Sequence, residues 1–338
     1  MFNFNPKRVF IEKKALDYKL GVDLWHRFNE EGKEVIILGS NRVTGLPGDS
    51  LAEKFSEAKQ TLVIAVRRSL KFASCKPSAD YQLVTSTSCP GKCEYCYLHT
   101  TLGRQPVVRL YVNINEILAQ ADRLTEERTP SNTTFEGSAT TDPIPLERFS
   151  GSLAQVIEFF SKREHAYFRF VTKFTEIEEI LTLSHNGHTT IRFSVNTPEI
   201  IKRYEHGTPS LERRLAAAVK IAAAGYPIGF LIAPIMFQPD WQRSYKELIN
   251  TMCSLLPANA EPSFELITHR FTKRGKANIQ AVFPNSTLPL DESERRFKFG
   301  QFGYGKYLYS LEKMKDAEEF FKENLLEAFP RGKLLYFV

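Results

Sequence analysis

The chain has 338 residues, of which 42% are hydrophobic and 25% are charged, and its formal net charge is +6. This composition is typical of a globular protein and argues against a disordered or low-complexity chain. We find no run of about 18 apolar residues and no signal-peptide pattern at the start, so we expect a cytoplasmic protein without a membrane span. The five cysteines are an odd number, and their clustering argues against a secreted disulfide framework.

The first 80 residues combine short strand-like runs with one short helical segment. Residues 7–12 and 34–39 are apolar and strand-like, and residues 21–32 between them have a helical pattern. Another apolar run follows at residues 58–70. We expect residues 1–80 to form an N-terminal extension that packs on the following domain.

From residue 81 to residue 270, strand-like and helical segments alternate. The expected strands are 81–87, 133–140, 167–174, 189–196, 226–236 and 262–268, and the expected helices are 113–128, 151–165, 176–184, 210–225 and 241–257. Such alternation predicts right-handed crossovers and a parallel sheet, which is an α/β fold. Six units are too few for the closed eight-stranded barrel, so we predict a partial, TIM-like (β/α)6 barrel.

Residues 271–338 break this alternation. Residues 296–310 place three glycines between aromatic and basic side chains, which is typical of a basic hairpin. A helix at 311–329 and a short strand at 333–338 are expected to close the chain. Aromatic side chains interleaved with Arg and Lys suit phosphates and stacked bases, although a solvated surface would have the same composition.

Three cysteines with the spacing C-x3-C-x2-C follow the first strand of the alternating region. Cys89, Cys93 and Cys96 therefore lie where loops at the carboxyl ends of parallel strands form a site. Zinc commonly takes four ligands, and Cys75 and Cys253 are too isolated to supply a second pair. Iron–sulfur clusters also use four cysteines, so three would leave one iron open to another ligand. Structural zinc and inert thiols remain alternatives, but we favour the open cluster.

This motif in this fold pattern resembles the radical S-adenosylmethionine superfamily. Within it, the segments "KPSADY", "CEYCYLHTTLG", "RFVTK", "HNGHTTIRFSVN", "FELITHRFTKRGK" and "GYGKYLY" resemble the spore photoproduct lyase family, from about residue 60 to the C-terminus. The resemblance implies a DNA-repair lyase. It would use a 5′-deoxyadenosyl radical from S-adenosylmethionine to revert spore photoproduct, 5-thyminyl-5,6-dihydrothymine, to two thymines in ultraviolet-damaged DNA.

The resemblance also implies roles for individual residues. Cys89, Cys93 and Cys96 would hold a 4Fe-4S cluster, and Tyr95 and Tyr97 would line the cofactor and take part in catalysis. Residues at positions that contact S-adenosylmethionine would be Thr141, Lys173, Ser194 and Ala233. Those on the DNA-contacting hairpin would be Gln301, Phe302, Lys306 and Tyr307, of which the first two replace an Arg and a Tyr of the family. We further expect an electron donor such as flavodoxin or ferredoxin, and a monomer.

The hydrogen-donor cysteine of the family is missing from its usual place. The corresponding position is Ala139, and an alanine cannot donate a hydrogen atom. Cys75 falls where the family usually has a serine, so we hypothesise that Cys75 has taken over the donor role. Cys75 as a small buried hydrophobe, or a pair of engineered changes, are the alternative interpretations.

Two other functions remain compatible with the sequence. One is a different radical S-adenosylmethionine enzyme that acts on another nucleic acid or a small substrate. The other is a zinc-stabilised nucleic-acid-binding protein. Reconstitution with iron and sulfide distinguishes the zinc protein from both enzymes.

Overall fold

The structure is a computed structural model that describes residues 4–39, 42–299 and 305–338. The chain divides into two compact units, residues 1–91 with 104–190 and residues 92–103 with 191–338. The three-part division expected from the sequence stays a prediction. No helix in these described ranges has the length and apolar character to cross a membrane.

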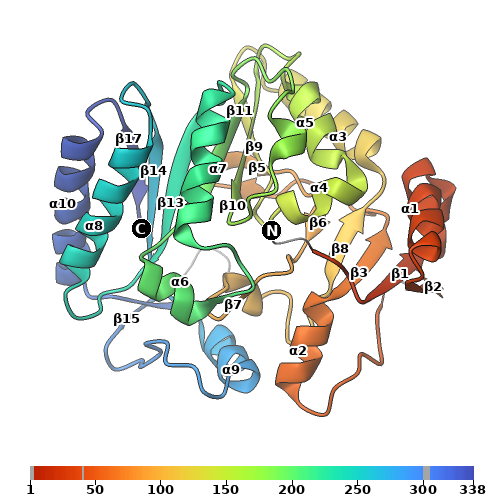
Figure 1. Cartoon of the computed structure of the whole chain (residues 1–338), viewed down its shortest axis with the longest axis horizontal. Coiled ribbons are helices and arrows are strands. Elements are labelled where there is room, and N and C mark those ends of the chain that lie inside the picture. The colour runs from red at the N-terminus through yellow and green to blue at the C-terminus, as the bar shows by residue number, and fades with distance from the viewer. Residues whose placement is uncertain (1–3, 40–41, 300–304) are drawn as a thin grey trace. The chain divides into compact units, whose positions relative to one another are not determined.

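The first unit contains a five-stranded sheet in the order β2-β1-β3-β8-β6. Its strands are β1 (Arg8–Glu12), β2 (Glu34–Leu38), β3 (Thr61–Ala65), β6 (Ser86–Thr87) and β8 (Val108–Tyr111). β1 pairs in parallel with β2 and β3, and β3 with β8, whereas β6 pairs antiparallel with β8. Every residue of β3 is buried, as expected for a central parallel strand. Figure 1 shows α1 (Lys19–Glu30) beside β1 and β2. The N-terminal residues thus have a hydrophobic core, which the sequence did not predict.

The larger sheet has eight strands in the order β17-β14-β13-β11-β10-β9-β5-β4. In the first unit these are β4 (Ser74–Cys75), β5 (Ala79–Gln82), β9 (Thr133–Glu136) and β10 (Ala166–Thr172). In the second unit they are β11 (Thr189–Val195), β13 (Ile228–Ile235), β14 (Ser263–Thr268) and β17 (Lys333–Phe337). The pairs β5–β9, β9–β10, β11–β13 and β13–β14 are parallel. Each of the six expected segments contains strand structure, but residues 81–87 are divided between β5 and β6 of different sheets, and the second strand ends at Glu136.

Amphipathic helices follow the strands in both units. The first unit has α2 (Leu51–Lys59), α3 (Ile114–Glu126), α4 (Ile144–Ser150) and α5 (Ser152–Phe160). The second has α6 (Pro198–Tyr204), α7 (Leu211–Ala223), α8 (Trp241–Leu255), α9 (Lys273–Val282) and α10 (Leu311–Ala328). In α3, Ile114, Ile117, Leu118 and Ala121 are buried at the three- and four-residue spacing of one helix face. Figure 1 shows α8 and α10 side by side.

The prediction of a helix at residues 176–184 is wrong. Only the 3-10 turn Glu178–Ile180 forms there. Asn186 and Gly187 follow closely with φ angles of 48° and 74°, so a left-handed turn ends the segment before a stable helix can grow. Conversely, the sequence reading missed α6, although Thr197 caps it through the Ile200 amide and Pro198 occupies its first turn.

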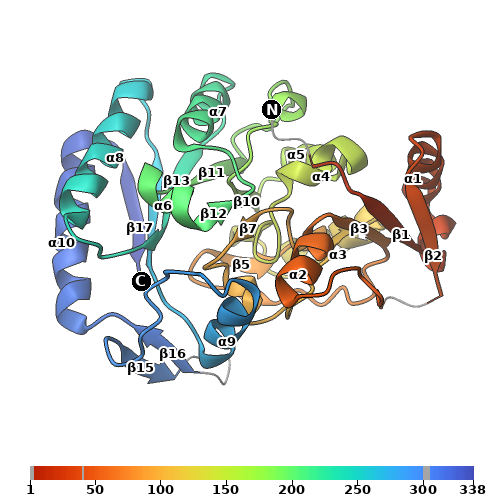
Figure 2. The same ribbon diagram turned by 60° about the horizontal axis from the view of Figure 1, so that its bottom comes forward.

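The hairpin expected near the C-terminus is confirmed in its two strands. β15 (Arg296–Phe299) pairs antiparallel with β16 (Gly305–Leu308). Figure 2 shows this hairpin and α9 on the same side of the second unit. Gln301 and Phe302 lie outside the described residues.

Candidate functional site

The three clustered cysteines lie in the loop after β6. Cys89 belongs to the first unit, and Cys93 and Cys96 belong to the second. Cys93 is buried on the short strand β7 (Lys92–Cys93), whereas Cys89 and Cys96 are partly exposed. Cys96 precedes the 3-10 turn Tyr97–His99. Three cysteines within eight residues suit a group that is held by thiolates.

A buried lysine holds the start of this loop in the first unit. Lys59, at the end of α2, is only 4% exposed. Its ammonium donates to the carbonyl oxygen of Cys89 at 2.9 Å and to Ser88 Oγ at 3.2 Å. The lysine therefore fixes the backbone at the start of the cysteine loop.

In the second unit, the backbone around Cys93 pairs with the segment after α6. Cys93 lies opposite Glu205 in the antiparallel ladder between β7 and β12 (Glu205–His206). The Glu94 amide donates to the carbonyl of Tyr204 at 2.9 Å. The Glu94 carboxylate contacts His206 Nε2 at 2.7 Å and accepts from Ser286 Oγ at 2.5 Å. Both backbone and side-chain hydrogen bonds therefore hold this part of the cysteine loop in place.

A buried network links Tyr95 to the carboxyl end of β11. The Tyr95 hydroxyl donates to one oxygen of Glu205, and Arg214 Nη2 donates to the other at 2.5 Å. Arg214 Nη1 also donates to the carbonyl of Ser194 at 2.9 Å. Burial, followed by the charge of Glu205, raises the pKa of Tyr95 well above its ordinary value, so the phenol stays protonated.

Two of the expected S-adenosylmethionine contacts lie close to one another in the first unit. Thr141 Oγ1 donates to the carbonyl of Ser88 at 2.6 Å and accepts from Ser86 Oγ at 2.9 Å. Its neighbour Asp142 is buried and accepts from the backbone amide of Lys173 at 2.8 Å. Burial raises the pKa of Asp142 to about 7, although hydrogen bonds and the Lys173 ammonium oppose this shift. A protonatable carboxyl therefore lies beside both expected contacts.

The other two expected contacts lie on neighbouring parallel strands of the second unit. Ser194 is next to last in β11 and is buried, and Ala233 lies near the end of β13 and is partly exposed. The carboxyl ends of parallel strands are where α/β folds bind ligands. Both residues therefore lie at the expected edge.

Cys75 and Ala139 lie in nearby segments of the first unit. Cys75 is on β4 and pairs with Ala79 at the start of β5, and β5 in turn pairs with β9. Between them, Ser78 Oγ donates to Glu136 Oε2 at 2.8 Å, and the Ser138 amide donates to Glu136 Oε1 at 3.1 Å. β5 lies between β4 and β9 in the sheet order, which places Cys75 and the segment that leads to Ala139 in the same part of the first unit.

The expected hairpin contacts differ in exposure. Tyr307 is buried, and its ring stacks on Phe271 with 5.3 Å between centroids. Lys306 lies directly opposite Lys298 in the ladder, and burial, together with the charge of Arg270, lowers its pKa. Like charges in such a pair repel unless an anion lies between or beside them. Phe299 is 75% exposed, so the outer surface of the hairpin is both basic and aromatic.

Comparison with known proteins identifies the family. The model of the family described as "Spore photoproduct lyase" matches residues 4–338. The chain is 47% identical to the spore photoproduct lyase of Clostridium acetobutylicum, with 98% of each chain covered. This chain belongs to the spore photoproduct lyase family. The Bacillus subtilis (strain 168) member is 42% identical, over 99% of this chain and 98% of the relative.

Solved structures of spore photoproduct lyase confirm the predicted fold class. One is a complex with dinucleoside spore photoproduct, which matches with a TM-score of 0.96 and 42% identity over 99% of both chains. Another, with the same scores and coverage, is a variant with one cysteine changed to alanine and one serine changed to cysteine. That variant has S-adenosylmethionine and dinucleoside spore photoproduct bound.

Several residues around this family's motif were missed from the sequence, namely Lys59, Asp142, Glu205 and Arg214. Charged residues in a sequence normally indicate a solvent-exposed position, so a buried role is not expected for them. For Arg214 there was a signal, because Leu211, Leu215 and Ala218 share its helix face and are buried, so the arginine interrupts an apolar stripe. For Lys59, which ends a helix among other charged residues, we see no such signal.

Proposed function

We propose that this chain is a radical S-adenosylmethionine lyase that reverts spore photoproduct in DNA to two thymines, with Cys75 as its hydrogen donor. The whole-chain match to the family carries the first part of this proposal. The paired presence of Cys75 and Ala139 carries the second part. The solved double variant supports it, because that protein combines the same two residue types, a lost cysteine and a gained one in place of serine.

The residues present fit a 4Fe-4S cluster by their chemistry. Cys89, Cys93 and Cys96 would be its ligands, and the buried Lys59 ammonium would offset their negative charge. No three His, Cys, Asp or Glu side chains are already grouped as a metal-ion site within the described ranges. The assignment therefore rests on the motif and its donor set. When bound, the cluster and S-adenosylmethionine together supply the 5′-deoxyadenosyl radical.

The protein's own groups would bind and orient S-adenosylmethionine. Lys173 supplies an ammonium for its carboxylate, and Thr141 and Ser194 supply hydroxyl groups. The backbone at Ala233 offers further polar contacts at the end of β13. Tyr95 would position the cysteine loop through Glu205 and Arg214.

The hydrogen atom that completes the repair would come from Cys75. The S–H bond of Cys75 breaks, a C–H bond forms on the thymine methyl radical, and a thiyl radical remains on Cys75 Sγ. Tyr97, which is 62% exposed, would return a hydrogen atom to the thiyl: its O–H bond breaks, an S–H bond forms on Cys75, and the electron donor together with a proton would reduce the phenoxyl radical left on Tyr97. Lys306, Tyr307, Gln301 and Phe302 would contact the DNA. A cytoplasmic location, a monomeric state and a flavodoxin or ferredoxin as reductant stay predictions.

Product analysis of Cys75 variants tests the donor. With Cys75→Ala, we expect S-adenosylmethionine cleavage to continue while clean conversion of dinucleoside spore photoproduct is lost and misquenched thymine adducts appear. Adding Ala139→Cys to Cys75→Ser should restore clean repair. Unchanged formation of two thymines by Cys75→Ala would contradict the assignment.

A further inference from the structure

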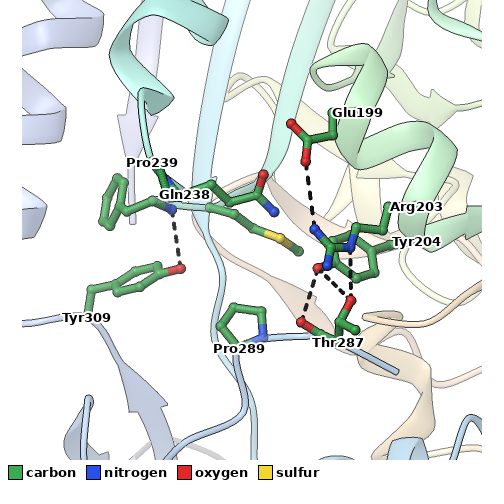
Figure 3. Close-up of a pocket in the computed structure, with 10 residues that line it drawn as sticks. Glu199, Arg203, Tyr204, Gln238, Pro239, Thr287, Pro289 and Tyr309 are labelled. Carbon is green, nitrogen blue, oxygen red and sulfur yellow. Dashed lines mark hydrogen bonds and ion pairs between the residues drawn. The ribbon is translucent and has the colours of Figure 1, made fainter. Parts of the chain in front are cut away.

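A pocket of about 450 Å³ lies within the second unit, apart from the residues assigned above. Figure 3 shows it between the side chains of α6, the segment after β13, and the segments on either side of the hairpin. Its volume is within the range of small-molecule sites. Among its lining residues are Arg203, Tyr204, Phe237, Gln238, Pro289 and Tyr309.

The position of the pocket connects two features of the fold. Arg203 and Tyr204 end the helix after β11, and Phe237 and Gln238 follow β13, so the pocket lies at the carboxyl ends of parallel strands. Pro289 precedes β15 and Tyr309 follows β16, which makes the rest of its wall the base of the hairpin. A strand of DNA that contacts the hairpin would thus run past the pocket.

One wall of the pocket is aromatic. The rings of Phe237 and Tyr309 are 4.4 Å apart between centroids, and the Trp241 ring lies 5.0 Å from that of Phe237. The guanidinium of Arg295 lies 3.5 Å from the centroid of the Tyr309 ring and supports it. Aromatic walls with a nearby guanidinium suit a planar base, which stacks on them whatever its sequence.

The opposite side is polar and held in place. Arg203 Nε donates to Thr287 Oγ1 at 2.9 Å, and the Tyr204 hydroxyl donates to the Thr287 carbonyl at 3.1 Å. Arg203 is 46% exposed and lies 3.7 Å from a Glu199 oxygen, a loose pair that leaves its charge available to a phosphate.

The side-chain amide of Gln238 completes the recognition groups. It is partly buried and makes no hydrogen bond to another residue in the described part of the chain. Figure 3 shows it pointing into the space between Pro239 and the side chains of α6. An amide presents both a donor and an acceptor, which matches the edge of a nucleobase.

We propose that this pocket holds one undamaged nucleobase of the DNA next to the lesion. The inference rests on the proposed repair function, because extraction of the lesion leaves the two opposite bases unpaired and the flanking bases without a stacking neighbour. The base would pack against Phe237, which is only partly buried and is backed by Tyr309, while Gln238 would contact the edge of the base and Arg203 the adjoining phosphate. The pocket would thereby hold the duplex open during repair without touching the lesion.

Kinetics on two substrates test this role. Gln238→Trp fills the pocket, and we expect it to raise the KM for a duplex oligonucleotide with one spore photoproduct about tenfold, because one stacked base is lost. The KM for dinucleoside spore photoproduct, which has no neighbouring base, should stay unchanged. Arg203→Ala should act in the same direction, and Arg243→Ala, an exposed arginine of α8, is the matched charge control. Equal KM values for wild type and Gln238→Trp on the duplex would overturn the proposal.

A binding measurement keeps this inference separate from the repair function, since it needs no turnover. We place 2-aminopurine at single positions opposite and beside the lesion and titrate each duplex with unreduced protein. At one position of 2-aminopurine, binding of the wild-type protein should change the fluorescence, and Gln238→Trp should abolish this change. At the other positions, the two proteins should give the same fluorescence response. The proposal is contradicted if wild type and Gln238→Trp give identical fluorescence responses at every position. Tight binding of free dAMP, abolished by Gln238→Trp without any effect on duplexes, would instead assign the pocket to a free nucleotide and also contradict it.

Discussion

Glu205 and Arg214 show what single buried charges do beside the cysteine loop. Arg214 is fully buried, Glu205 is 3% exposed, and their ion pair receives the Tyr95 hydroxyl on one side and binds the Ser194 carbonyl on the other. Removing one partner of such a pair leaves an uncompensated buried charge, which costs about 3–5 kcal/mol. The pair thus ties the loop after Cys93 to the end of β11.

At the same scale, Asp142 links stability to pH. Its pKa is about 7 in the folded protein and near 4 when exposed, so the folded state binds more protons between these values. The stability that this carboxyl contributes is therefore greatest at low pH and is lost as the pH rises through 7. We expect Asp142→Asn to gain stability relative to wild type as the pH rises from 5 to 8. Urea unfolding across this range measures the difference, and a difference independent of pH would contradict the assignment.

At the scale of elements, strands were easier to predict than the contacts between them. The alternation of β-branched and aromatic residues predicted β10, β11, β13 and β14, because each pattern is local. The prediction of a helix at 176–184 was wrong, because the left-handed turn that follows this segment limits its length despite the helical spacing of its apolar residues. The five-stranded N-terminal sheet depends on pairing between distant segments, which no local pattern reveals.

Gly137, directly after β9, illustrates such a tertiary constraint. A Cβ there would lie 2.5 Å from Cζ of Phe168, a buried ring of the neighbouring strand β10. We therefore expect Gly137→Ala to lower the free energy of unfolding by about 1–3 kcal/mol through overpacking. Gly39→Ala, where no atom lies within 4 Å of the added Cβ, is the matched control and should change stability little. Equal unfolding midpoints for the two variants in urea would disprove this packing argument.

At the scale of the whole molecule, a small net charge is compatible with a basic hairpin that binds DNA. The chain as a whole carries only +6, yet Lys298 and Lys306 lie opposite each other in the hairpin. The basic and aromatic composition predicted this hairpin, and the structure confirms its strands. The base of the hairpin also forms part of the proposed base pocket, which could not be predicted because its walls come from segments far apart in the sequence.

The salt dependence of DNA binding tests the hairpin's role. Lys298→Ala should reduce the slope of log K against log salt by about 0.9, the effect of one lost phosphate contact. Lys315→Ala on α10, another exposed lysine, which pairs with Glu319, should leave the slope unchanged. Fluorescence anisotropy with a lesion-containing duplex gives both slopes. If both variants had the same slope as wild type, Lys298 of the hairpin would not contact a phosphate.

The three candidate cluster ligands are the part of the site for which the sequence has the clearest local pattern, and their role stays a prediction. The C-x3-C-x2-C spacing is local, and the family resemblance supplied the meaning of its third cysteine. The supporting residues Lys59, Glu205 and Arg214 come from distant elements, so only the folded chain brings them to the loop.

Anaerobic turnover of dinucleoside spore photoproduct is the most direct test of the central claim. The protein is reconstituted with iron and sulfide and incubated with S-adenosylmethionine, dithionite and the lesion. The products are then separated by chromatography and identified by mass spectrometry. We expect conversion of the lesion to the intact thymine dinucleoside, and no conversion with Cys93→Ala. Cleavage of S-adenosylmethionine by the wild-type protein with the lesion left unchanged would contradict the account.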